Sequence, residues 1–173
     1  IPYSPPTTYA KVNLDRAGRI AASYDNMKHD PQNPDVAAAY SAMISETVAQ
    51  YQAIKKTGLK VEFIDFEKQG DPYEASPRLA TEDVRNNNHL WVFPTSSGFG
   101  SDASFDPRTN PLLSKTGEMI SGKIALANDV FRVVHDYFGH IKNGVGFRAD
   151  GEENAWRSHS SMNSPLARRA MTT

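Results

Sequence analysis

The chain has 173 residues, of which 39% are hydrophobic and 23% charged, and its formal net charge is −1. These values are typical of one globular domain with its own core, and they give no global field toward nucleic acid or an anionic membrane. No apolar run approaches the roughly 18 to 20 residues that a membrane-spanning helix needs, so we expect a soluble protein, with the cytoplasm favoured as its location. The absence of cysteine excludes disulfides, thiolate metal sites and a cysteine nucleophile.

Both ends of the chain resemble cut ends. The chain starts at Ile1 without a methionine, and it stops shortly after a basic, helix-like stretch at 166–169. Arg168 and Arg169 are too few to form a nucleic-acid-binding patch. We therefore interpret 1–173 as a single domain taken from a longer polypeptide, with neither nucleic acid nor a membrane as its partner.

Two helices are expected in the first third of the chain. Residues 9–27 could form a short helix that covers the core. The residues that would share its inner face are Ala17, Ile20, Ala21 and Tyr24. The clearer helix begins at Asn33, a good N-cap, with Pro34 in the first helical position, and ends before Gly58. Its apolar stripe consists of Val36, Tyr40, Met43, Thr47, Tyr51 and Ile54.

Two short strands are expected next. Residues 59–66 alternate with period two, and 89–93 form an apolar run that Pro94 stops. The two strands could pair in a small sheet, with a short helical turn at 79–87 between them. The Gly-, Ser- and Asp-rich segment 95–110 matches no phosphate-binding consensus, so it is either a plain surface loop or a loop that covers a substrate. Residues 111–123 are expected to continue as irregular chain.

The stretch 128–159 carries the chemical signal, because it holds three of the five histidines. Asn128 is a plausible N-cap for a helix that is apolar on most sides and contains His135 and Asp136. Buried groups of this kind are costly unless they are paired or bound to a metal. His135 and His140 are about 140° apart around an ideal α-helix. They could therefore face each other only if the helix ends or loosens at Gly139.

A second helix over 152–162 would supply the carboxylate. Glu152 shares a helical face with Ala155, Trp156 and His159, whereas Glu153 points about 100° away. We predict Glu152 as the third metal ligand beside His135 and His140, with Glu153 as the alternative. His159 would be a partner of a metal ligand, an acid–base group or a substrate contact, and Asp136 would orient a ligating histidine.

The segment HDYFGH at 135–140 resembles the HExxGH segment of the pterin-dependent aromatic amino-acid hydroxylases. In that family two histidines bind a catalytic iron, and a glutamate further along the chain completes the site. The resemblance covers six residues and implies that His135 and His140 bind iron, with Asp136 in place of the family's glutamate. Glu152 or Glu153 would follow sooner than the family's third ligand does. The wider stretch also looks like segments of large multidomain phage proteins.

Two histidines and one carboxylate leave open positions on a metal ion, which is the arrangement of iron(II) oxygenases. The substrate would be a small molecule or a peptide. Candidate walls for its pocket are Trp91, Phe93, Phe99, Phe138 and Trp156. With zinc, the same ligands would activate water for hydrolysis, with Asp136 or Glu153 as general base. A third possibility is a non-catalytic, metal-stabilised assembly module of a larger phage protein.

An alternative without metal stays open. His135 and His140 could be core histidines bonded to Asp136 and to backbone carbonyls, and Glu152 and Glu153 could simply favour a helix N-terminus. We favour a metal, with iron(II) ahead of zinc. The expected fold is a mainly helical α+β domain with a small two- or three-stranded sheet and a metal site between two helices.

Overall fold

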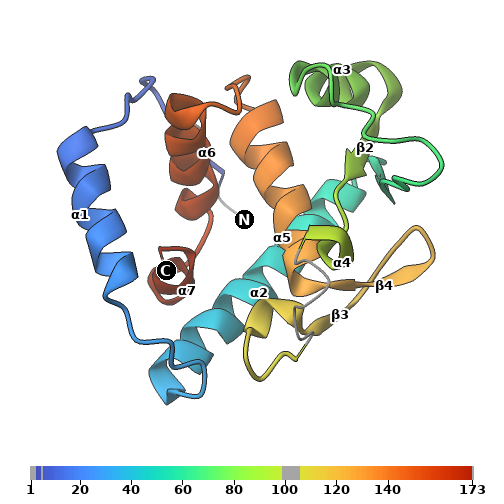
Figure 1. The fold of residues 1–173 in the computed structure, drawn as a ribbon. Coiled ribbons are helices and arrows are strands. Elements are labelled where there is room, and N and C mark those ends of the chain that lie inside the picture. Colours follow the sequence, from blue (N-terminus) through green and yellow to red (C-terminus); the bar gives the residue numbers. More distant parts are fainter. Residues whose placement is uncertain (1–2, 5, 99–105, 173) are drawn as a thin grey trace.

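The computed structural model describes residues 3–4, 6–98 and 106–172 of the chain. Within these residues the chain forms seven α-helices and two small two-stranded sheets, which confirms a mainly helical α+β fold. The strands lie on the side of the molecule away from α1 (Figure 1). The α-helices are α1 (Leu14–Asp25), α2 (Pro34–Lys55), α3 (Arg78–Asn87), α4 (Thr95–Gly98), α5 (Ala127–Val134), α6 (Ala149–Ser161) and α7 (Pro165–Met171). The strands are β1 (Lys60–Phe63), β2 (His89–Val92), β3 (Lys115–Ile120) and β4 (Lys123–Leu126). A 3₁₀ turn, η1 (Pro111–Leu113), and a π-helical segment, η2 (His135–Ile141), complete the elements.

Helix α2 is the scaffold on which α5 and α7 pack. It begins as predicted, because the Asn33 side chain accepts a hydrogen bond from the Asp35 backbone N–H at 2.9 Å and Pro34 occupies the first turn. Beyond its end, Gly58 has φ 82°, the left-handed conformation that stops a helix. Its buried face contacts α5 and α7. This packing fixes the helix that leads into the histidine cluster.

The predicted pair of strands is present, and it is parallel. Strand β1 runs beside β2 with Lys60 opposite His89 and Phe63 opposite Val92. The expectation of irregular chain over 111–123 is wrong, because β3 and β4 form an antiparallel hairpin there. Ser121 (φ 49°) and Gly122 (φ 73°) make the connection, and positive φ at both positions is typical of the two-residue turn that suits a hairpin.

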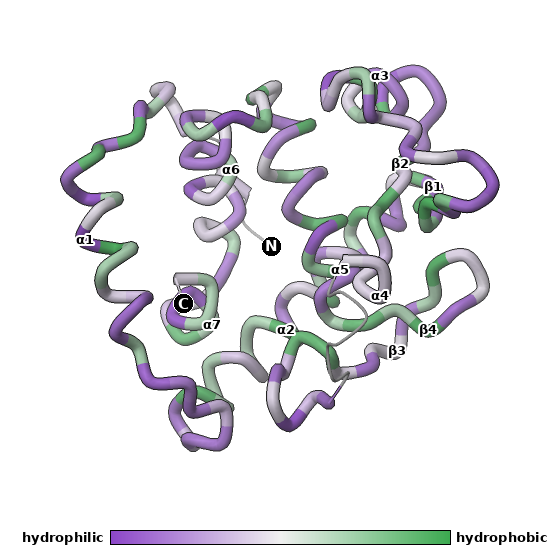
Figure 2. Tube along the Cα trace, viewed as in Figure 1, coloured by the Kyte–Doolittle hydropathy of each residue, from purple (hydrophilic) through white to green (hydrophobic). Residues whose placement is uncertain are grey.

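Two other expectations about helices are also wrong. Helix α5 begins at Ala127 rather than after Asn128, and the Asp129 carboxylate accepts a hydrogen bond from the Leu126 backbone N–H at 2.8 Å. Helix α1 forms, but it buries none of its residues and so does not cover the core. Hydrophobic and hydrophilic positions alternate along α1 (Figure 2), and Ile20 and Tyr24 are exposed.

The loop at 95–110 is only partly described. Thr95–Gly98 forms the short helix α4, and Thr95 donates from both its backbone N–H and its hydroxyl to the Asp129 carboxylate, at 2.8 and 2.5 Å. Residues 99–105, and with them the proposed wall residue Phe99, lie outside the described residues. In the part of the chain that is described, no helix is both long and apolar enough to span a membrane.

Candidate metal centre

The two histidines of the HDYFGH segment face each other because the chain is π-helical there. Helix α5 runs directly into η2, which lies beside α6 (Figure 1). The backbone hydrogen bonds step by five residues, from Lys142 N–H to the Tyr137 carbonyl at 2.8 Å and from Val145 N–H to the His140 carbonyl at 3.1 Å. In such a winding, residues five apart share a face, and π-helical turns are frequent at functional sites. The helix therefore widens at this point, whereas the sequence predicted that it ends or loosens at Gly139.

Three ligand atoms converge beside this segment. Nε2 of His135 lies 3.1 Å from Nε2 of His140, and Oε2 of Glu152 lies 3.3 Å from each of these nitrogens. Atoms about 2.1 Å from a common metal ion lie roughly 3.0 Å apart at a right angle and roughly 3.4 Å apart at the tetrahedral angle. The observed triangle therefore has the dimensions of three ligands on one ion.

The protonation states of the triangle suit metal binding. Burial lowers the pKa of His140, and the neighbouring His135 lowers it further, so the His140 imidazole is neutral at neutral pH. The His135 hydrogen bond lowers the pKa of Glu152, which is therefore ionised. A neutral imidazole and a carboxylate are the forms that bind a metal.

One backbone carbonyl orients the buried histidine. Nδ1 of His140 donates to the Gly146 carbonyl oxygen at 3.0 Å, so the lone pair of His140 lies on Nε2 and faces His135. The Phe147 ring stacks on the His140 ring, with centroids 4.0 Å apart and an interplanar angle of 13°. His140 is fully buried. Its tautomer and its ring plane are thus both fixed before any ligand arrives.

Two glycines allow the helices to approach this closely. A Cβ on Gly139 would lie 3.0 Å from the Ala155 Cβ, so α6 packs directly on η2. A Cβ on Gly151 would lie 1.7 Å from the Gly146 carbonyl oxygen, the same oxygen that holds His140. Gly151 is therefore a requirement of the site, and sequence reasoning missed it, because the neighbour that excludes a side chain comes from a preceding loop.

Asp136 lies next to the triangle. A carboxylate oxygen of Asp136 and one ring nitrogen each of His135 and His140 all lie within 4.8 Å of one another. Burial raises the pKa of Asp136 to about 6; the charge of Glu152 adds to this effect, while His135 and Arg132 oppose it. Among the described residues no donor forms a hydrogen bond with the Asp136 side chain, so the structure does not show it orienting a histidine.

His159 lies on the other side of His135. Its ring centroid is 5.8 Å from that of His135 and 4.9 Å from that of Phe131. It is fully buried, and neither ring nitrogen has a hydrogen-bond partner among the described residues. Burial lowers its pKa to about 3, with a further contribution from His135. His159 is therefore a neutral neighbour of the cluster and not a member of the triangle.

Glu153, the alternative ligand, is not brought to the histidines. Its carboxylate pairs with Arg16 of α1 and accepts a hydrogen bond from Arg157 Nε at 2.8 Å. Burial acts to raise its pKa, but the hydrogen bonds of the two arginines hold the pKa below its ordinary value. The structure thus brings Glu152 to the histidines, whereas the adjacent Glu153 forms ion pairs with Arg16 and Arg157.

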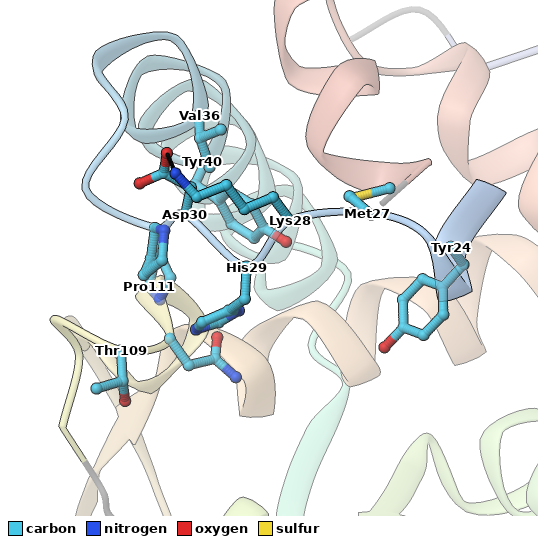
Figure 3. Close-up of a pocket in the computed structure, with 11 residues that line it drawn as sticks. Tyr24, Met27, Lys28, His29, Asp30, Val36, Tyr40, Thr109 and Pro111 are labelled. Atoms are coloured by element: carbon cyan, nitrogen blue, oxygen red, sulfur yellow. Dashed lines mark hydrogen bonds and ion pairs between the residues drawn. The ribbon is translucent and has the colours of Figure 1, made fainter.

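The aromatic residues that were proposed as walls of a substrate pocket lie in different parts of the structure. Trp91 and Phe93 line a cavity of about 220 Å³ that also includes Asp136. Phe138 belongs to the hydrophobic core instead, and Trp156 lies on α6 with 38% of its surface exposed. A larger cavity of about 380 Å³ lies between the α1–α2 connection and residues 109–111, and its lining includes Tyr24, His29 and Tyr40 (Figure 3). None of the residues around that larger cavity belongs to the histidine cluster.

No family model, no curated protein and no solved structure matches this chain. The resemblance of 135–140 to the hydroxylase segment, and that of the wider stretch to phage proteins, therefore stay predictions.

Proposed function

We propose that this chain is a metal-dependent enzyme of the non-haem iron oxygenase type. His135 Nε2, His140 Nε2 and the Glu152 carboxylate would bind iron(II) on one face. The observation that carries the proposal is the triangle of these three atoms, with sides of 3.1, 3.3 and 3.3 Å. Two histidines and one carboxylate with open positions form the ligand set of iron(II) oxygenases.

A count of donors supports a cation at the centre of the triangle. The His140 Nδ1 proton is used by the Gly146 carbonyl, so His140 Nε2 is an acceptor, and the Glu152 carboxylate is also an acceptor. His135 Nε2 can supply at most one proton for the three short contacts. Unsatisfied acceptors at close range are costly, and a metal ion would satisfy all three at once.

The shape of the cluster favours a catalytic ion over a structural one. A structural zinc is enclosed by four protein ligands, whereas a catalytic metal keeps a position open. The side chains of His135 and Glu152 are 25% and 48% exposed, so the side of the triangle away from His140 is accessible. Iron bound there would serve to activate dioxygen. The protein's own residues would hold it, position the substrate and move protons, and Asp136 is the nearest free carboxyl group for proton transfer.

A zinc-dependent hydrolase using the same ligands is the second candidate, and Asp136 favours it. A general base works best when its pKa lies near the operating pH. The pKa of Asp136 is about 6, and its side chain is not engaged by any described donor. In this alternative Asp136 would take a proton from water as the water attacks the substrate.

The test is metal binding by the full chain. We would load metal-free protein with iron(II) under anaerobic conditions, or with zinc, and measure stoichiometry and affinity. The variants would be His135→Ala, His140→Ala and Glu152→Gln, with Glu153→Gln as the matched control. One equivalent should bind, and the first three variants should lose affinity by at least about 100-fold, while the control retains it.

The outcomes separate the candidates. Tight iron(II) binding followed by substrate-dependent oxygen consumption supports the oxygenase, whereas preferential zinc binding followed by hydrolysis favours the second candidate. Binding of neither metal, or equal loss in the Glu152→Gln and Glu153→Gln variants, overturns the proposed centre. Asp136→Asn should retain metal and lose turnover if Asp136 moves protons.

A further inference from the structure

The cavity of about 220 Å³ beside the cluster combines aromatic and acidic walls. Its aromatic residues are Tyr73, Trp91, Phe93 and Phe147, and its charged residues are Asp71 and Asp136. The remaining lining residues are aliphatic side chains or proline, and no lysine, arginine or histidine contributes to the wall. The composition of the wall therefore disfavours an anion and favours a cation with an apolar surface.

The aromatic walls are held in place by the surrounding structure. The Tyr73 hydroxyl donates to Asp83 at 2.6 Å and accepts from the Trp91 backbone N–H at 2.9 Å. The Trp91 ring is met edge-on by the His89 ring at 4.8 Å, and Phe93 packs against Phe66 at 4.7 Å. Rings that are fixed in this way need little reorganisation when a ligand binds.

Aromatic faces attract cations through the ring quadrupole, most strongly when the cation is poorly hydrated. One ring already shows this interaction, because the Arg132 guanidinium lies 5.4 Å from the centroid of Phe93. Arg132 is not part of the cavity wall, whereas Tyr73 and Trp91 are, and Phe147 lines it with one ring face already covered by His140. Asp136 has no hydrogen-bond donor among the described residues and would provide the opposite charge.

We propose that this cavity binds an alkylated ammonium group, such as trimethylammonium. The cavity is smaller than the roughly 300–1,000 Å³ of pockets for drug-sized ligands, so it suits one compact head group rather than a large molecule. A quaternary or methylated ammonium matches aromatic walls better than a primary amine does, since it is less hydrated and has no need of several acceptors.

Because the cavity adjoins the histidine cluster, such a ligand would be the substrate of the proposed metal centre. Phe147 both lines the cavity and stacks on His140, with ring centroids 4.0 Å apart, and Asp136 is shared between the cavity and the cluster. Binding of the ammonium group stands on the cavity alone. Its assignment as the substrate rests on the proposed metal-dependent function.

The experiment compares choline with its uncharged isostere 3,3-dimethylbutan-1-ol, which has the same shape. Both are titrated into the metal-free full chain and into the metal-loaded chain, with binding followed by calorimetry. Choline should bind at least about tenfold more tightly than the isostere, because only the cation gains from the aromatic faces and Asp136. Transfer of nuclear Overhauser effects from the choline methyl groups should reach the indole protons of Trp91.

Substitutions of cavity residues test whether choline binds in this cavity. Trp91→Leu and Asp136→Asn should each weaken choline binding by about tenfold or more, while Trp156→Phe, a change to the tryptophan that does not line the cavity, should leave it unchanged. Equal affinity for choline and the isostere, or no Overhauser transfer to Trp91, overturns the proposal even if a variant fails to fold. Choline binding to metal-free protein that takes up no metal would support this inference and refute the proposed function, so the two can fail separately.

Discussion

The protein contains two clusters of histidine and carboxylate that differ in how their acceptors are satisfied. In the first, His89 bonds Asp83 through Nδ1 at 2.7 Å and Glu62 through Nε2 at 3.0 Å. Asp83 also accepts from Tyr73 and from Asn87, and Glu62 pairs with Lys60 at 2.8 Å. Each carboxylate of this cluster thus has a donor other than His89, so its acceptors are satisfied within the structure.

The second cluster has the same residue types and the opposite balance. His135, His140 and Glu152 place three ligand atoms within 3.3 Å of one another, while the one fixed proton, on His140 Nδ1, points to a backbone carbonyl. Composition alone could not distinguish the clusters, because both contain histidine and carboxylates. The difference lies in the donors that surround them, which identifies the first cluster as a structural clamp and makes the second the candidate ligand set.

The largest effect on stability is expected from Gly151→Ala, which also disturbs the second cluster. The new Cβ would meet the Gly146 carbonyl oxygen at 1.7 Å, so the carbonyl that orients His140 must move. Loss of such an orienting contact lowers metal affinity by about 10- to 100-fold. The overpacked backbone should also lower the free energy of unfolding by about 3 kcal/mol. Metal titration and urea unfolding would measure the two effects.

Gly146→Ala is the matched control for that substitution. A Cβ on Gly146 meets no atom within 4 Å, and its φ is not in the left-handed range. Its free energy of unfolding should change by no more than about 0.5 kcal/mol. Equal effects of the two substitutions on metal affinity would show that the loop tolerates no side chain at all, and that the contact between Gly151 and Gly146 has no special role.

The next prediction compares two histidine substitutions, one in each cluster. His89→Ala should change stability without changing metal binding, whereas His140→Ala should abolish the stabilisation by metal. His89→Ala removes the partner of both Asp83 and Glu62 and should lower the free energy of unfolding by about 1 to 3 kcal/mol, without changing metal affinity. A metal present at about 100 times its dissociation constant should stabilise the wild type and His89→Ala by about 2.7 kcal/mol. It should not stabilise His140→Ala. Thermal unfolding with and without metal measures this, and metal-dependent stabilisation of His140→Ala would contradict the distinction between the clusters.

The sequence was informative where local rules decide the structure. Helix α2, its cap at Asn33 and its stop at Gly58 follow from positions that neighbours in the chain determine. The strands β1 and β2 follow from their apolar patterns, and their parallel pairing does not, because it depends on how α3 carries the chain back. The hairpin β3–β4 was missed although Ser121-Gly122 is a recognisable turn between alternating residues.

For the candidate site, the sequence allowed us to predict which residues take part. It allowed us to predict their arrangement in space only in part. The spacing of His135 and His140 indicated that an ordinary α-helix would fail to join them, but it could not say that the chain would widen into a π-helix. The choice of Glu152 over Glu153 followed from the helical face shared with Ala155, and the structure places Glu152 at the histidines. The close approach at Gly151 depends on a loop that folds back, so no local pattern encodes it. Metal binding itself stays a prediction.

A smaller effect concerns the pH dependence of the first cluster. Burial acts to raise the pKa of Asp83, but the hydrogen bonds of Tyr73, Asn87 and His89 hold it below the ordinary value of 3.8. A carboxyl group with a lowered folded-state pKa stabilises the protein above pH 3.8, and this contribution is lost as the pH falls through the folded-state pKa. Asp83→Asn should therefore cost about 1 to 3 kcal/mol at neutral pH and progressively less in acid. Urea unfolding across a pH series would measure it, and a constant difference at all pH values would contradict it.

The smallest effect is expected from Glu153→Gln. This substitution tests whether the carboxylate that directly follows Glu152 in the sequence contributes to metal binding. Glu153, whose side chain is 15% exposed, pairs with Arg16 and Arg157, whose side chains are 39% and 43% exposed, so solvent screens the arginine ends of these pairs. The free energy of unfolding should fall by no more than about 1 kcal/mol, and less at high salt. Metal affinity should be unchanged, because the Glu153 carboxylate does not face the histidines, whereas Glu152→Gln removes a charged ligand. A loss of metal affinity in Glu153→Gln as large as that in Glu152→Gln would overturn the assignment of Glu152 as the carboxylate ligand.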